Sequence, residues 1–229
     1  MTLDEAMAAL EAAGTEQNRK IYRRHGLADP MFGVSYAALG KLKKQIKRNQ
    51  PLAAGLWATG NHDAQVLATM VADPAAFDAR LLDEWAQSAV DYAIQDALAK
   101  DVTVHTPHVR ALAEKWIASG DDLVKRAGWA TVGSLATFGP AGIPDDWFLQ
   151  FLPPIESQMH RSPNRVKEAM NNALIAIGSR NESLRGPATD AARRIGKVSV
   201  DHGETNCKTP DAVAYIDRTH ARRETRASA

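Results

Sequence analysis

Apolar residues recur at steps of three and four through most of the 229-residue chain, and alternating apolar and polar runs are nearly absent. A period near 3.6 residues predicts amphipathic α-helices, whereas half-buried strands need a period of two. Gly, Pro and capping residues divide the pattern into about a dozen short helices joined by short loops. The pattern therefore predicts an all-α fold whose helices bury their apolar stripes against their neighbours.

The boundaries of these helices follow from N-cap residues, N-terminal prolines and C-terminal glycines. Similar helix pairs recur about every 35–45 residues, which is within the range of HEAT-type repeats. We therefore expect an α-solenoid of stacked helix pairs over residues 1–196. The expected helices are 3–13, 15–24, 36–48, 51–57, 62–71, 78–88, 90–100, 106–119, 121–137, 144–159, 164–178 and 182–196.

The pattern changes after Gly196, where residues 197–229 form a separate C-terminal part. Residues 197–215 are polar, rich in turn formers and aperiodic, and Val198 and Val200 allow a short extended piece. Thr209 and Pro210 can start a final short helix. The tail 221–229 has little to bury, so we expect it to be frayed.

Composition indicates a soluble globular protein, with 45% hydrophobic and 24% charged residues. Cys207 is the only cysteine, so no intrachain disulfide can form. The N-terminus lacks the basic and apolar regions of a signal peptide, and no apolar run reaches the roughly 20 residues that span a bilayer. We expect a location in the bacterial cytosol or nucleoid and no membrane partner.

The net charge of +1 conceals a strongly basic N-terminal region. Between Arg19 and Arg48 there are nine Lys or Arg residues and one acid, Asp29. Such a basic region fits a polyanion such as a nucleic-acid backbone, although a solvated lysine-rich helix has the same composition. The candidates for DNA contact on the basic helix are Lys41, Lys43, Lys44, Lys47 and Arg48.

The stretch 84–99, EWAQSAVDYAIQDALA, holds the candidate catalytic pair. On a helix, Tyr92 and Asp96 are four residues apart and lie on one face. A ring beside a carboxylate suits a cation or a cation-like transition state. The alternative is an ordinary helix with Tyr92 half-buried and Asp96 solvated.

Several segments together resemble the DNA alkylation repair (AlkD-like) proteins, a family of HEAT-like-repeat DNA glycosylases. They are GVSYAALGKLKKQIK (33–47), LAAGLWATGNHDAQVLATMVADP (52–74), EWAQSAVDYAIQDALA (84–99) and KWIASGDDLVKRAGWATVGSLA (115–136). The resemblance implies an enzyme that encircles damaged duplex DNA. It also implies excision of cationic N3- or N7-alkylated purines without a metal and without flipping the base into a deep pocket.

Carried over by position, the resemblance places the family's catalytic aspartate at Asp96 and a catalytic aromatic residue at Tyr92. It places an arginine that approaches the DNA backbone at Arg126, three residues before Trp129, which would neighbour that site. The second catalytic tryptophan of the family falls on Asn172, and this departure removes an aromatic wall. At about 1–2 kcal/mol for a cation–π contact, tenfold or more in rate would disappear.

Residues 200–216, VDHGETNCKTPDAVAYI, resemble the closing motif of a divergent branch of the same superfamily. Asp201, His202, Cys207 and Lys208 form a second candidate site there. A zinc site, a nucleophilic cysteine and a hydrogen-bonded structural loop are the three readings, although the spacing matches no standard zinc motif.

Three functions remain open at this point. The first is a DNA-binding alkylation-repair protein with N-glycosylase activity on cationic alkylpurines. The second is a non-catalytic nucleic-acid-binding scaffold on the same fold, and the third is a separate activity of the 200–216 motif. The expected partner is duplex DNA, damaged or branched, bound by a monomer. No nucleotide-binding, zinc-protease or serine-hydrolase motif is present, so no cofactor is expected.

Overall fold

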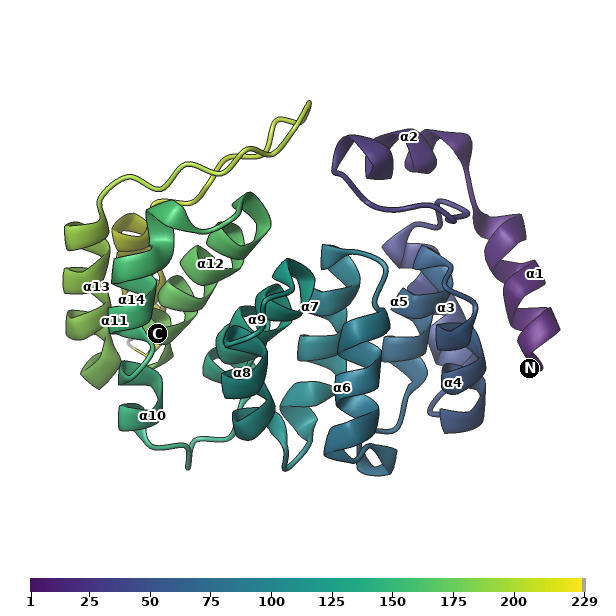
Figure 1. Cartoon of the computed structure of the whole chain (residues 1–229), viewed down its shortest axis with the longest axis horizontal. Coiled ribbons are helices and arrows are strands. Elements are labelled where there is room, and N and C mark those ends of the chain that lie inside the picture. Colours follow the sequence, from purple (N-terminus) through teal and green to yellow (C-terminus); the bar gives the residue numbers. More distant parts are fainter. Residues whose placement is uncertain (228–229) are drawn as a thin grey trace. The chain divides into compact units, whose positions relative to one another are not determined.

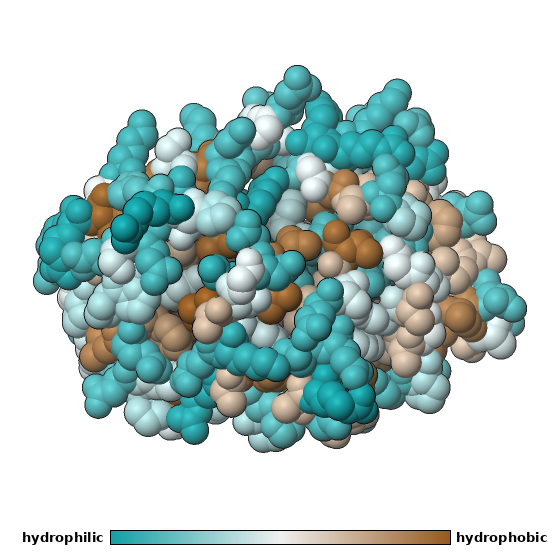
Figure 2. All heavy atoms as spheres, in the orientation of Figure 1, coloured by the Kyte–Doolittle hydropathy of each residue, from teal (hydrophilic) through white to brown (hydrophobic). Residues whose placement is uncertain are grey.

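A computed structural model describes residues 1–227, and these residues form fourteen α-helices and three short 3-10 helices (Figure 1). No strand occurs within this range, where one isolated bridge joins Gly14 and Val34. The all-α fold expected from the apolar periodicity is therefore confirmed. The face seen in Figure 2 is covered mainly by hydrophilic residues, as expected for helices that turn their apolar stripes inward.

The helices group into two compact units. Unit 1 contains Met1–Leu112 and the short segment His202–Asn206, and unit 2 contains Ala113–Asp201 and the described residues from Cys207 onward. The division falls inside helix α8 (Val109–Ile117). None of the helices in residues 1–227 is long and apolar enough to cross a membrane.

In unit 1, helices α3, α5 and α7 lie in succession, with α5 against both of the others. Their N-caps are Ser35, Asn61 and Asp91, whose side chains accept backbone N–H bonds from the first turn of each helix. Together with α8, the helices of this unit are α1 (Leu3–Ala13), α2 (Glu16–Arg24), α3 (Tyr36–Ile46), α4 (Gln50–Ala58), α5 (His62–Val71), α6 (Ala79–Ser88) and α7 (Tyr92–Asp101).

Tryptophans fill the core. Trp57 and Trp85 stack in parallel with ring centroids 4.0 Å apart, and Phe77 meets Trp85 edge-on. All five tryptophans are buried. Such aromatic pairs contribute more to stability than their buried area alone accounts for, and the Trp57–Trp85 pair holds α4 against α6.

In unit 2, helix α12 is the central element and packs against α9, α13 and α14. The expected single helix 144–159 is wrong, because the chain forms two helices there. Pro153 lacks an N–H group and its ring clashes with a preceding helical carbonyl, so the second helix starts afresh at Leu152. The helices are α9 (Asp122–Phe138), α10 (Asp145–Leu149), α11 (Leu152–Gln158), α12 (Asn164–Arg180), α13 (Glu182–Ile195) and α14 (Ala212–Ala227).

Residues 196–211, here called the α13–α14 segment, leave α13 and return to α14 as extended backbone (Figure 1). The amide of Val200 donates to Oγ1 of Thr209 at 3.0 Å, which ties the outgoing run to the returning one. The helix expected after Pro210 is present but longer than predicted. It continues to Ala227, so the expected fraying of 221–229 is wrong for the described part, and residues 228–229 lie outside the described residues.

Candidate nucleic-acid interface

Helix α3 and the two residues that follow it present a basic surface with one aromatic ring; the helix ends at Ile46, two residues before the expected end at 48. Leu39 and Leu42 face the core, whereas the side chains of four lysines, Arg48 and Tyr36 are exposed. Tyr36 retains 55% of its surface. We call this set the α3 surface, and its members are Tyr36, Lys41, Lys43, Lys44, Lys47 and Arg48. The expected solvent exposure of the basic residues is confirmed.

Tyr36 lies within the electrostatic reach of the candidate catalytic acid. Desolvation of the phenol, the neighbouring Tyr22 and the charges of Asp91, Asp96 and Asp101 raise the pKa of Tyr36 to about 12. Like an ordinary tyrosine, the phenol is neutral at physiological pH and can donate a hydrogen bond. Asp96 is half-buried and is thus not turned out into bulk water.

Lys43 of the α3 surface lies near a second acid, Asp101, at the end of α7. Burial raises the pKa of Asp101, and the charges of Lys100 and Lys43 oppose that rise. Lys43 therefore lies close enough to Asp101 for their charges to interact within unit 1.

Tyr92 does not present its hydroxyl group to a ligand. The side chain is half-buried, and its hydroxyl donates to the carbonyl of His25 at 3.1 Å. The bond ties α7 to the end of α2. The structure therefore gives Tyr92 a structural contact that the expected catalytic role did not include.

Two buried carboxylates hold the loop that leads into α3. Asp63, only 1% exposed, accepts hydrogen bonds from the amides of Phe32, Gly33 and Val34 at 2.7, 2.9 and 2.9 Å. Gly33 has a φ of +77°, and a Cβ there would come within 2.6 Å of the carbonyl oxygen of Thr15. The loop is thus fixed by contacts that no other residue type at 33 would allow.

Asp91 is the second buried carboxylate that holds this loop, and it is paired with His62. We call the contacts of Asp63, His62 and Asp91 with the loop the anchor. Nδ1 of His62 lies 2.6 Å from Oδ2 of Asp91, and both side chains are almost fully buried. Asp91 also accepts from the amide of Ala28 and caps α7. His62 is thus a buried residue at the start of α5 rather than a surface residue.

Arg126 and Trp129, which belong to unit 2, are not surface residues. Arg126 is 2% exposed, and its Nη1 donates to the carbonyl of Arg165 at 2.6 Å and to Glu168 at 2.8 Å. Trp129 is 1% exposed and meets Phe151 edge-on. A buried and paired guanidinium does not reach a phosphate, so both residues are reassigned to the core of unit 2.

Asn172, at the position of the family's second catalytic tryptophan, is exposed on α12. It lines a hollow of about 390 Å³ together with Tyr215, Ser179 and Arg223. Tyr215 keeps 46% of its surface, and the guanidinium of Arg218 lies 5.5 Å from the centre of its ring. No local pattern in the sequence predicts this aromatic neighbour, because Tyr215 lies 43 residues beyond Asn172 in the chain.

The second candidate site is spread along the α13–α14 segment rather than gathered. The backbone of Asp201 is bound by the amide side chain of Asn164, His202 belongs to the part grouped with unit 1, and Cys207 and Lys208 are exposed. Within residues 1–227, no group of three or more His, Cys, Asp or Glu side chains could hold a metal ion. The readings of this motif therefore remain predictions.

Comparison with known proteins adds to this geometry. Residues 6–216 match the family described as DNA alkylation repair enzyme. Two uncharacterized proteins, Lin0241 of Listeria innocua and Lmo0209 of Listeria monocytogenes, are each 26% identical over 239 residues, which cover 97% of this chain and 99% of either relative.

One solved structure is similar over nearly the whole chain. It is described as a new family of proteins related to the HEAT-like repeat DNA glycosylases with affinity for branched DNA structures. It is 33% identical, covers 97% of this chain and 95% of its own, and superposes with a TM-score of 0.86. The expected HEAT-like fold is thereby confirmed, and the chain belongs to the DNA alkylation repair enzyme family.

Proposed function

We propose that this protein binds structured DNA, with branched DNA as the preferred form, and that it does so without excising a base. The observation that carries the proposal is the α3 surface, where an exposed ring accompanies five cationic side chains. Lysines and arginines neutralise phosphates, and an exposed ring can stack on a base that is unpaired at a branch. The solved relative, which has affinity for branched DNA, supports the same partner class.

Two features speak against base excision by the route that the family resemblance implies. Asn172 stands where an aromatic wall is needed, and Arg126 is buried. A developing sugar cation would therefore meet fewer stabilising groups.

The experiment measures DNA affinity by fluorescence anisotropy, using a four-way junction, a fork and a linear duplex at several salt concentrations. Replacing Lys43 and Lys47 by Ala should weaken binding to all three DNAs and lower the salt slope by about two, one for each lost phosphate contact. Arg80→Ala is the matched control, because Arg80 is exposed on α6 and already pairs with Glu84. Equal salt slopes for wild type and the double variant would contradict the proposal.

N-glycosylase activity is the second candidate, favoured by a half-buried Asp96 beside the α3 surface. Its assay measures the release of methylated purines from alkylated duplex DNA. If the wild type releases base and Asp96→Asn does not, the protein is an enzyme and the part of our first proposal that excludes base excision is wrong. If both proteins bind DNA and neither releases base, the binding function stands alone.

A further inference from the structure

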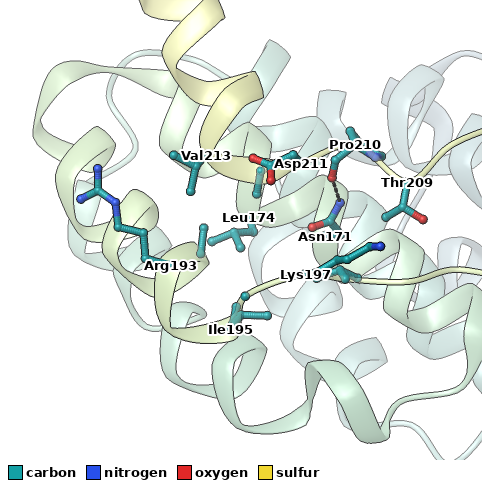
Figure 3. Close-up of a pocket in the computed structure, with 13 residues that line it drawn as sticks. Asn171, Leu174, Arg193, Ile195, Lys197, Thr209, Pro210, Asp211 and Val213 are labelled. Carbon is teal, nitrogen blue, oxygen red and sulfur yellow. Dashed lines mark hydrogen bonds between the residues drawn. The ribbon is translucent and has the colours of Figure 1, made fainter.

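A cavity of about 420 Å³ opens in unit 2 where the α13–α14 segment begins and ends. Its wall is formed by the end of α13, the start of α14 and one face of α12 (Figure 3). The volume lies within the range of small-molecule sites, about 300–1,000 Å³. The candidate catalytic and DNA-contact residues discussed above do not line it, although part of the 200–216 motif does.

Asn171 gives this cavity a specific polar group. The side chain is 1% exposed, and its amide nitrogen donates to the carbonyl of Pro210 at 3.0 Å. The amide oxygen is buried and has no hydrogen-bond partner among the described residues. The carbonyl of Pro210 fixes the orientation, because a reversed amide would bring two oxygens together.

A buried acceptor without a partner costs about 1–3 kcal/mol, and this one belongs to the cavity lining. In Figure 3 the oxygen of Asn171 points toward Leu174, whereas its nitrogen points to Pro210. A ligand that donates an N–H group to this oxygen would recover that cost.

The remainder of the lining divides into an apolar part and a charged rim. Leu174, Ile195 and Val213 face the cavity from three helices. Lys197 is exposed and lies on the Asn171 side, near Thr209. The cavity thus offers apolar walls to a flat ring, the buried amide oxygen of Asn171 and the carboxylate of Asp211 as acceptors, and the cations Lys197 and Arg193.

The geometry points to this cavity as a site for one unpaired nucleotide that carries an exocyclic amino group. The amino group of adenine, cytosine or guanine donates to Oδ1 of Asn171, the ring lies against Leu174 and Val213, and the phosphate lies near Lys197. Thymine fits less well, because its N–H group lies between two carbonyl oxygens. When that N–H donates to Oδ1 of Asn171, both carbonyl oxygens of the base are brought close to the same acceptor and repel it. This inference rests on the proposed binding of branched DNA, which supplies unpaired nucleotides, but it concerns a different unit of the chain.

The first experiment uses branched DNA with one unpaired position at the branch, occupied by adenine, cytosine, thymine or an abasic sugar. We expect the adenine DNA to bind about fivefold or more tightly than the abasic DNA, with thymine in between. Val213→Trp fills the cavity and should abolish this preference. Ala214→Trp is the matched control, since Ala214 is exposed on the same helix and does not line the cavity.

A second pair of variants avoids changing a helix. Val198→Trp should act as Val213→Trp does, because Val198 lines the cavity from the extended segment. Ser199→Trp, the next residue and exposed, should leave the preference intact. A wild type that ignores the identity of the unpaired base, or filled variants that keep the preference, would overturn the inference.

The third arm separates this site from the function of the α3 surface. The side-chain amide signals of Asn171 are followed by NMR during a titration with dAMP and, separately, with dTMP. If dAMP shifts them in the wild type and not in Val213→Trp, the cavity binds nucleotide even if branched DNA does not bind. If branched DNA binds through α3 but neither base identity nor dAMP has an effect, the cavity inference fails and the proposed function remains. If dAMP shifts the signals but base identity in DNA does not matter, the ligand is a free nucleotide and the DNA assignment is overturned.

Discussion

Replacing Asp63 by Asn is the most direct test of the anchor that precedes α3. The carboxylate accepts three backbone amides, two through Oδ2 and one through Oδ1, and it is almost fully buried. An amide in its place keeps one oxygen, which can serve the pair from Phe32 and Gly33. Its NH₂ group must then face the N–H of Val34, so one bond is lost and two donors oppose each other.

The magnitude follows from these contacts. A hydrogen bond to a charged group contributes about 1.5–3 kcal/mol and a neutral one about 0.5–1.5 kcal/mol. One bond of the first kind is lost and two are converted to the second kind, which gives a loss of about 3–5 kcal/mol. For a chain of this size each kcal/mol shifts the Tm by about 2–4 °C, so we expect a fall of at least 6–12 °C or so.

Thermal unfolding followed by circular dichroism measures this shift. Asp4→Asn is the control, because Asp4 is exposed in the first turn of α1 and should change stability by less than about 0.5 kcal/mol. A variant at position 63 whose Tm stays within about 2 °C of the wild type would refute the reasoning. The three bonds would then be geometrically present but energetically small.

Three more predictions test other parts of the molecule. Tyr36→Ala should weaken binding to branched DNA by about 1–3 kcal/mol if the ring stacks on a base, whereas Tyr36→Phe should keep the affinity. Equal losses of affinity for the two variants in an anisotropy titration would exclude stacking. Glu168→Gln removes the carboxylate from buried Arg126 and should cost about 3–5 kcal/mol at pH 7. Burial raises the pKa of Glu168, but Arg126 and Arg165 together hold it below its ordinary value of 4.5. The stabilisation by this ion pair is present above that value and is lost as the pH falls below it. Urea unfolding should therefore show the difference in unfolding free energy between wild type and Glu168→Gln shrinking in acid. A difference that stays constant with pH would argue against the ion pair. Gly128→Ala should destabilise the protein by about 1–3 kcal/mol, because a Cβ there lies 2.5 Å from the backbone nitrogen of Ile117. Gly40→Ala meets no atom within 4 Å and should stabilise the protein. Similar urea midpoints for the two variants would contradict the packing argument.

Helix boundaries in this chain could be predicted well wherever a local capping group defines them. Asn61 starts α5 and Asp121 starts α9 within a residue of the expected positions. The end expected at Gly178 is wrong, because α12 continues to Arg180. That glycine serves close packing instead, since a Cβ would lie 2.5 Å from Cδ1 of Ile216 on α14. A helix-ending glycine and a packing glycine are identical in sequence.

The candidate site was predictable only in part, for a similar reason. The exposure of Lys43 follows from local periodicity, and the structure adds its proximity to Asp101. Burial of Arg126 depends on Glu168, 42 residues away, and the partner of Tyr92 is 67 residues away. Contacts at such separations are set by the packing of helices, and no single segment encodes them.

Both ends of the α13–α14 segment join helices that are packed on α12. Ile216 is fully buried, and a ring nitrogen of His220 lies 2.8 Å from the carbonyl of Gly178, which fixes α14 as firmly as α13. Insertions between Asp201 and Thr209 leave the packing of α13 and α14 on α12 unchanged, and their loop-closure entropy costs about 0.6 kcal/mol for each doubling in length. The segment is consequently a place where related chains can diverge in length at little thermodynamic expense, and grafting a longer or shorter version is a practical way to alter the protein without redesigning its core.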